Sequence, residues 1–207
     1  MAPMLDMRVC ELLAARLCHD LAGPIAAIAN GSELLGDDDL DFAREAAALI
    51  GDSARTAAKR LQLFRYVYGF GRGSQAGPPP HALATEYFAG SSIACDYPEA
   101  VRALEPEWQR LACNLLLVGA EGLPRGGRLT LAALAPGVAL TAVGEGDGPP
   151  QEIRDALAPA VVITALTSRS VGAYFAGILA RNLGCRLVLT GQPGQFQIAC
   201  EAGAPAA

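Results

Sequence analysis

Apolar residues in the first third of the chain recur with the period of an α-helix. Between Leu5 and Leu35 they form one stripe at spacings of four and seven residues, made of Leu13, Leu17, Leu21, Ile28 and Leu35. A second helical pattern runs from about Asp41 to Tyr68. Gly36 and the aspartates at 37–39 predict a short turn, so the helices should form an antiparallel hairpin. Because two helices alone cannot bury both stripes, we expect a homodimer that closes into a four-helix bundle.

The pattern changes after Gly69. Residues 70–80 are rich in Gly, Ser and Pro and predict a linker. Beyond it, helical patterns are mixed with apolar, β-branched runs that predict strands. The expected helices are 108–117 and 171–183, and the expected strands are 128–134, 138–143, 186–190 and 195–200. We therefore predict an α+β protein, with a helical hairpin domain at 1–69 and, at 81–207, an α/β sandwich whose sheet is antiparallel or mixed.

Composition and charge exclude several classes of function. The chain has 207 residues and a net charge of −5 with no basic run, so it has no general attraction for nucleic acid or anionic membranes. Charged residues between Asp6 and Asp20 argue against a signal peptide or membrane span and predict a cytoplasmic protein. The six cysteines form no CxxC pair, and no histidine has the spacing of a zinc partner. We expect the cysteines to be small buried hydrophobes, and we expect no metal site.

His19 is the strongest candidate for chemistry. On a helix it lies roughly 180° from the stripe of Leu17 and Leu21, so its side chain should face solvent. The neighbours on its face are small and uncharged, namely Ala15, Ala22, Gly23 and Ala26. Such a face lets another protein approach the imidazole, whose neutral nitrogen is a good nucleophile toward a phosphoryl group. Asp20 follows directly and could orient or deprotonate the ring. The plain alternative is a surface histidine beside a solvated charge.

The residues around His19 resemble the phosphoacceptor box of sensor histidine kinases. From His19 onward they supply the histidine, an acid, an apolar residue, two variable positions and then Pro24. The wider stretch, including Glu33-Leu34-Leu35 and Ser53-Ala54-Arg55, resembles the ChpT-type histidine phosphotransferases of alphaproteobacteria. With the second half of the chain included, this resemblance covers nearly the whole sequence.

The second half resembles the ATP-binding (Bergerat) domain of histidine kinases, but its ligand positions are eroded. In that family an asparagine-bearing helix supplies a magnesium ligand. Here Asn114 matches the first asparagine, and Val118 replaces the second with a residue that cannot bind a metal. The stretch 144–148 has glycine where the family has an adenine-binding aspartate, and 168–173 has serines at two glycine positions of the phosphate-binding box. Loss at three boxes argues against ATP binding.

The resemblance implies a phosphorelay protein that carries a phosphoryl group on His19 between receiver-domain aspartates. The donor would be the receiver of a hybrid histidine kinase, and the acceptors would be separate response regulators. The chain itself would bind no cofactor, because Mg²⁺ would come with the receiver. We expect the C-terminal domain to help dock the receiver, and Arg16 and Arg65 to contribute to docking or charge stabilisation.

Gly23 adds a prediction about the removal of phosphate from the receiver. Kinases that also dephosphorylate their partners often carry Thr or Asn at this position, where the side chain can orient a water molecule. Because glycine has no such side chain, we expect little phosphatase activity by this route. Two alternative functions stay open at this point: an ATP-dependent sensor histidine kinase core, and a non-catalytic dimeric adaptor in which His19 is incidental.

Overall fold

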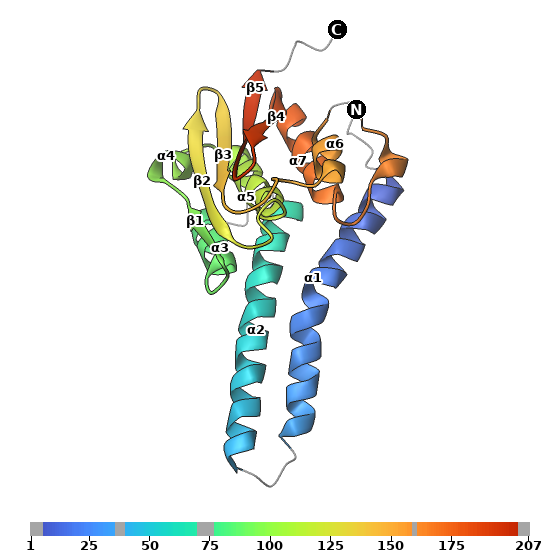
Figure 1. Ribbon diagram of the computed structural model, residues 1–207, viewed down its shortest axis with the longest axis vertical. Helices are drawn as coiled ribbons and strands as arrows, with labels where there is room; N and C mark the ends of the chain where they lie inside the picture. Colours follow the sequence, from blue (N-terminus) through green and yellow to red (C-terminus); the bar gives the residue numbers. More distant parts are fainter. Residues whose placement is uncertain (1–5, 36–39, 70–76, 159–160, 203–207) are drawn as a thin grey trace.

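The protein folds as a long helical hairpin followed by an α/β sandwich (Figure 1). The computed structural model describes residues 6–35, 40–69, 77–158 and 161–202. The helices are α1 (Met7–Leu34), α2 (Leu40–Tyr68), α3 (Pro80–Phe88), α4 (Glu99–Arg102), α5 (Pro106–Ala120), α6 (Gln151–Leu157) and α7 (Val171–Asn182), with a 3-10 turn at Ile163–Ala165. The strands are β1 (Ile93–Asp96), β2 (Gly127–Leu134), β3 (Gly137–Val143), β4 (Cys185–Gln192) and β5 (Gln195–Ala202).

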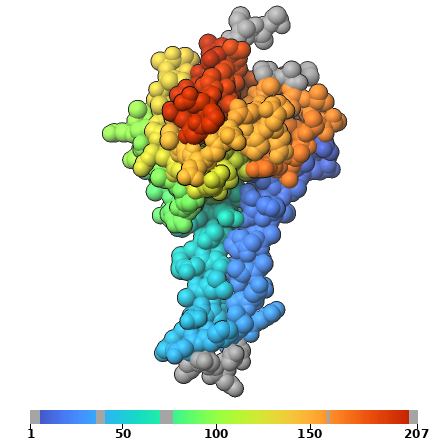
Figure 2. Space-filling model, in the orientation of Figure 1, coloured from blue at the N-terminus to red at the C-terminus, as the bar shows by residue number. Residues whose placement is uncertain are grey.

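The hairpin prediction is confirmed, with both helices ending within about two residues of the expected positions. Asp6 begins α1 as its N-cap, because its carboxylate accepts a hydrogen bond from the backbone N–H of Arg8 at 2.8 Å. The two helices pack along each other and form a narrow stalk beneath the broader C-terminal part (Figure 2). The predicted turn at 36–39 lies outside the described residues.

The five strands form one mixed sheet in the order β1-β2-β3-β5-β4. Strand β1 runs parallel to β2, and the other neighbours are antiparallel. Helix α5 packs on β2 and β3, and α7 packs on α5 and β4. All predicted strands and helices of this half are present. The sequence interpretation missed α3, β1, α4 and α6, which are four to nine residues long and too short for a clear period.

The hydrophobic core continues from the C-terminal domain into the open end of the hairpin. Val9, Leu63 and Val67 of the hairpin are fully buried in the same cluster as Leu111 and Leu140 of the sandwich. The upper part of the hairpin therefore packs as part of the C-terminal domain. Of the predicted linker, residues 70–76 lie outside the described part of the chain, and its last residue, Pro80, begins α3.

Arginine side chains also join the two parts. Arg8 of α1 donates to the backbone oxygen of Leu166 at 3.2 Å. Arg110 of α5 donates to the backbone oxygens of Val67 and Gly69, at 3.0 and 3.1 Å, where α2 ends. These bonds use the carbonyl groups that a helix end leaves unpaired. They fix the hairpin against the domain at both of its helices.

Two sequence expectations need correction. Cys113, Cys185 and Cys200 are buried as expected, but Cys10 and Cys18 are exposed on α1, because the hairpin there has only one packed side. The expectation that charges break up the apolar N-terminus holds only up to Asp20. From residue 21 to residue 32 no side chain is charged, and α1 is long and apolar enough, by length and composition only, to cross a membrane.

Candidate functional site

His19 lies in the middle of α1 with its side chain in solvent. The side chain is 86% exposed, as the helical pattern predicted. Its Nδ1 lies 3.3 Å from Oδ1 of Asp20. An ionised aspartate carboxylate only accepts hydrogen bonds, so this contact favours the tautomer with the proton on Nδ1. In that tautomer the Nε2 lone pair is the free nucleophile of the ring.

The surface around His19 is made of small residues. Ala15, Ala22, Gly23 and Ala26 are all exposed on the same helix. A Cβ placed on Gly23 would meet nothing within 4 Å, so this face is open to an approaching molecule. Long side chains are lacking at these four positions, and the imidazole is therefore accessible to a macromolecular partner.

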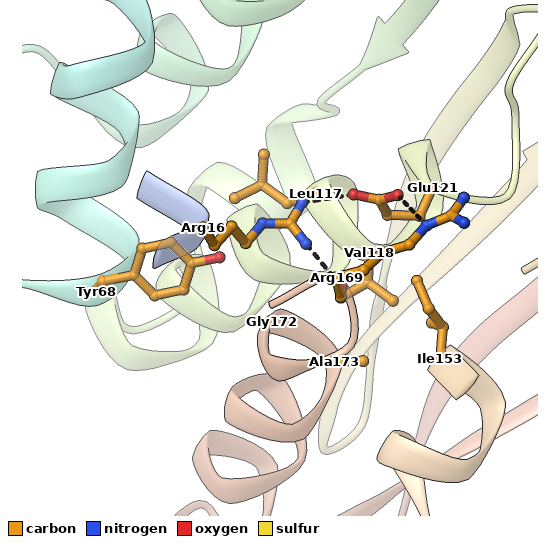
Figure 3. A pocket seen from close by; sticks show the side chains of 9 residues that line it. All are labelled: Arg16, Tyr68, Leu117, Val118, Glu121, Ile153, Arg169, Gly172 and Ala173. Atoms are coloured by element: carbon orange, nitrogen blue, oxygen red, sulfur yellow. Dashed lines mark hydrogen bonds and ion pairs between the residues drawn. The ribbon is translucent and has the colours of Figure 1, made fainter. Parts of the chain in front are cut away.

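Asp20 is held from a second side by Arg16, one helical turn earlier. The Nε of Arg16 lies 3.6 Å from Oδ2 of Asp20. Arg16 also crosses to the C-terminal domain, where Nη2 lies 2.5 Å from Oε1 of Glu121 and Nη1 donates to the backbone oxygen of Arg169 at 2.8 Å (Figure 3). The site at His19 is thus connected through two charged residues to the domain above it.

Burial and neighbouring groups shift the pKa of Arg16 in opposite directions. Its side chain is only 12% exposed, and this desolvation alone lowers the pKa of the guanidinium. The charges of Tyr68, Glu121 and Asp20 outweigh it, so the net pKa is raised. Burial raises the pKa of Tyr68 to about 12, so that phenol is neutral near pH 7, and the carboxylates of Glu121 and Asp20 are the counter-charges of Arg16 there.

The remaining residues that the sequence singled out lie in different places. Arg16 contacts the C-terminal domain instead of standing free on the open face, while Arg65 is exposed on α2. The α2 arginine that reaches the site is Arg60, which donates to the backbone oxygen of Asp20. Sequence reasoning missed Arg60, although a hairpin folded about residues 36–39 brings this part of α2 near Asp20. Glu121 and Arg169 were also missed, since their contacts depend on how the two parts pack.

The eroded magnesium position lies in the core. Asn114 is 1% exposed, and its Nδ2 donates to the backbone oxygen of Arg110 at 2.9 Å on its own helix. Its Oδ1 is buried with no hydrogen-bond partner within the described part of the chain. Val118, four residues on, is also buried. The amide is therefore used within α5, and the next turn presents only hydrocarbon.

The eroded phosphate position is filled by side chains. Ser170 is buried, and its hydroxyl accepts the backbone N–H of Thr167 at 3.0 Å. A Cβ on Gly172 would meet the hydroxyl of Tyr68 at 3.3 Å and Nη1 of Arg16 at 3.7 Å, so both side chains lie against the first turn of α7. The pocket drawn in Figure 3 lies between α5, α6 and α7, is closed by Arg16 of α1 and Tyr68 of α2, and is too tight for a water molecule.

A groove of about 430 Å³ opens on the other side of α2. Thr56, Lys59 and Arg60 of α2 line one wall, and residues 87–91, at the end of α3, line another. Arg60 belongs both to this groove and to the contact with Asp20. The groove therefore contains hairpin and C-terminal domain residues and is linked through Arg60 to the residue after His19.

Known proteins resemble this chain over most of its length. The family described as the histidine phosphotransferase C-terminal domain matches residues 80–194. The protein phosphotransferase ChpT of Brucella abortus (strain 2308) is 33% identical over an alignment of 186 residues, which covers 85% of this chain and 87% of that protein. A solved structure of a bacterial phosphotransferase superposes with a TM-score of 0.73 at 28% identity, covering 97% of this chain and 98% of the other.

These matches cover both parts of the molecule. The family model spans more than half of the chain and lies in the C-terminal domain, while the curated relative and the solved structure extend the likeness into the hairpin that carries His19. The order of hairpin and sandwich is also the order that the sequence motifs predicted. The chain belongs to the ChpT-type histidine phosphotransferases and is a phosphorelay histidine phosphotransferase.

Proposed function

We propose that His19 is the phosphoacceptor and that it passes the phosphoryl group between receiver-domain aspartates without ATP. The observation that carries this proposal is the exposed imidazole on a face of small residues, with Nδ1 toward Asp20. The donor would be the receiver of a hybrid histidine kinase, and the acceptors would be response regulators. The receiver would supply Mg²⁺, and this chain would bind no cofactor.

The proposed step is a single phosphoryl transfer. The lone pair of His19 Nε2 forms the N–P bond while the P–O bond to the receiver aspartate breaks, and that bonding pair leaves with the aspartate carboxylate. The ring gains a positive charge, which is shared between its two nitrogens, and its Nδ1 faces the carboxylate of Asp20. The transition state is loose, so positioning and charge stabilisation supply most of the catalysis. The reverse step passes the group to another receiver.

Three observations support action without ATP. Val118 cannot ligate a metal, the first turn of α7 is faced by Arg16 and Tyr68, and these side chains close the pocket beside it. A helix N-terminus favours anions such as phosphate, and here a protein cation with its own counter-ion, Glu121, takes that place. The C-terminal domain then serves docking, and the groove beside Arg60 is the surface we assign to the receiver.

A homodimer and a cytoplasmic location complete the proposal. Large apolar side chains are exposed on the hairpin, including Ile25 at 55% and Leu49 at 44%, and a second hairpin would cover them. Packing of α1 in a four-helix bundle accounts for its apolar character without a membrane. Sedimentation velocity tests this: wild type should sediment as a dimer and Leu49→Asp as a monomer, and a monomeric wild type would contradict it.

The decisive experiment is radiolabelled phosphotransfer with wild type, His19→Ala and His81→Gln. The last variant is a matched control, since the chain has only two histidines. One arm supplies labelled ATP with Mg²⁺, and the other supplies a panel of labelled phospho-receivers. We expect label from a receiver in wild type and His81→Gln and none in His19→Ala. Label from ATP alone would indicate a kinase. A His19→Ala variant that signals as well as wild type would indicate an adaptor.

A further inference from the structure

Glu121 lies next to the site at a position that its own helix disfavours. It is the C-cap residue of α5, where the negative end of the helix dipole opposes a carboxylate. Two guanidinium groups face it: Arg16 Nη2 lies 2.5 Å from Oε1, and Arg169 Nε lies 3.3 Å from Oε2. The side chain is only 23% exposed. A carboxylate held against its helix dipole by two arginines indicates a purpose beyond the stability of α5.

Arg16 connects Glu121 to the hairpin. Its Nη2 and Nη1 are bound on the C-terminal domain, by Glu121 and by the backbone oxygen of Arg169. Its Nε is buried without a hydrogen-bond partner among the described residues and lies 3.6 Å from Oδ2 of Asp20. Because the guanidinium is planar and rigid, fixing two nitrogens fixes the direction of the third. Glu121 thereby helps to hold Nε within ion-pair distance of Asp20.

Asp20 uses a different oxygen for each neighbour. Oδ2 faces Arg16, and Oδ1 faces Nδ1 of His19 at 3.3 Å. Its backbone oxygen accepts a hydrogen bond from Arg60, which holds this turn of α1 against α2. A carboxylate held on both sides cannot rotate without losing one partner. The orientation of the His19 ring is therefore coupled to Arg16.

We propose that Glu121 is a positioning residue for the phosphoacceptor. Acting through Arg16 and Asp20, it keeps the His19 proton on Nδ1 and the lone pair on Nε2, directed at the incoming phosphoryl group. This inference rests on the proposed role of His19 and deepens it. It gives the C-terminal domain a part in the chemistry of the hairpin that is separate from receiver docking.

The first test compares Glu121→Gln with a matched control. Glutamine keeps the size of the side chain and removes its charge. The control is Glu201→Gln, which removes a carboxylate from the ion pair with Arg186 on the β4–β5 hairpin. We expect His19 phosphorylation from a saturating phospho-receiver to slow about tenfold in Glu121→Gln. Glu121→Asp, which keeps the charge, should recover part of that rate, and the control should match wild type.

The second test reads the tautomer directly. Two-bond ¹H–¹⁵N spectra of the imidazoles contain signals from only two histidines, so His81 serves as an internal reference. Wild type should show His19 protonated on Nδ1, and Glu121→Gln should show a mixture while His81 is unchanged. If Glu121 had only a structural role, Glu121→Gln would lower thermal stability and leave the His19 tautomer unchanged. A folded Glu121→Gln protein with wild-type tautomer and rate would overturn the proposal.

A double variant checks the route. Asp20→Asn should slow transfer by itself, and adding Glu121→Gln should slow it no further, because both changes act on the same contact to His19. If the effects of the two substitutions on the transfer rate multiply, Glu121 acts by a route that does not pass through Asp20. If Glu121→Gln does not fold, the wild-type and Glu121→Asp spectra decide the matter. Absence of phosphohistidine in wild type with every receiver would instead refute the role of His19 itself.

Discussion

Two glycines of α1 should respond differently to the same substitution. Gly23 and Gly31 both lie inside the helix, and neither has a left-handed backbone. Gly23 is exposed, and a Cβ there would meet nothing within 4 Å beyond its chain neighbours. One of those neighbours is Pro24, whose ring disfavours a helical residue with a Cβ before it. Gly31 is buried against α2, and a Cβ there would lie 2.7 Å from Cγ1 of Ile50 and 3.4 Å from the backbone oxygen of Ala46.

The expected free energies follow from this difference. Replacing glycine by alanine inside a helix stabilises it by about 1 kcal/mol. At Gly23 the ring of Pro24 offsets part of that gain, so the free energy of unfolding should rise by less than about 1 kcal/mol. At Gly31 the methyl group must displace a β-branched side chain, and overpacking typically costs about 1–3 kcal/mol. Gly31→Ala should therefore be the less stable of the two variants, by up to about 3 kcal/mol.

Thermal and urea unfolding of the three proteins test this expectation. All samples should have the same protein concentration, because a dimer's stability depends on it. For a chain of this size, 1 kcal/mol shifts Tm by about 2–4 °C, so the difference is measurable and Gly31→Ala should unfold at the lower temperature. If Gly31→Ala is as stable as Gly23→Ala, the close approach of α1 and α2 at Gly31 is wrong. If Gly23→Ala is the less stable of the two variants, the exposed face around His19 is packed against something.

Three further outcomes are expected. Gly23→Asn places an amide that can orient a water beside His19, so phosphate release from a phospho-receiver should rise, as measured by a coupled phosphate assay. Leu63→Ala empties a fully buried position and should lower the free energy of unfolding by about 2–5 kcal/mol in urea titrations. Burial raises the pKa of Tyr68 to about 12, so folding holds its proton more tightly than the unfolded chain does. The contribution of Tyr68 to stability should therefore be constant below about pH 10 and fall toward about pH 12, by up to about 1.4 kcal/mol per pH unit. Tyr68→Phe should reduce the slope of stability against pH in this range.

Periodicity was sufficient for the long elements of the fold. The stripes of α1 and α2 and the runs of β2 to β5 are strong patterns, and each of these elements was predicted. Strand β1 has only four residues, and α4 also has four, so neither contains a full repeat of its pattern. Their position depends on pairing with β2 and packing on α5, which are long-range contacts that a local pattern does not record.

The site divides in the same way. The exposure of His19 and of the small residues around it follows from helical geometry, so the sequence alone predicted it. The surroundings of Arg16 could not be predicted in this way. Its helical position places it one turn before Asp20, but gives no information about Glu121, which is 105 residues away. Contacts between the hairpin and the sandwich require the orientation of one part against the other. Only the structure supplies that orientation.

The eroded nucleotide pocket and the position of Glu121 have one physical explanation. In a nucleotide-binding fold, phosphate brings negative charge to the first turn of the helix that α7 represents. Here Arg16 and Tyr68 lie against that turn, and a cation there is opposed by the positive end of the helix dipole. The carboxylate of Glu121 lies 2.5 Å from Arg16. Under the function proposed above, it supplies from the protein's own chain the charge that a nucleotide would otherwise bring. The contact from Arg16 to Asp20 then needs no ligand to form, as the proposed phosphorylation of His19 by a receiver requires.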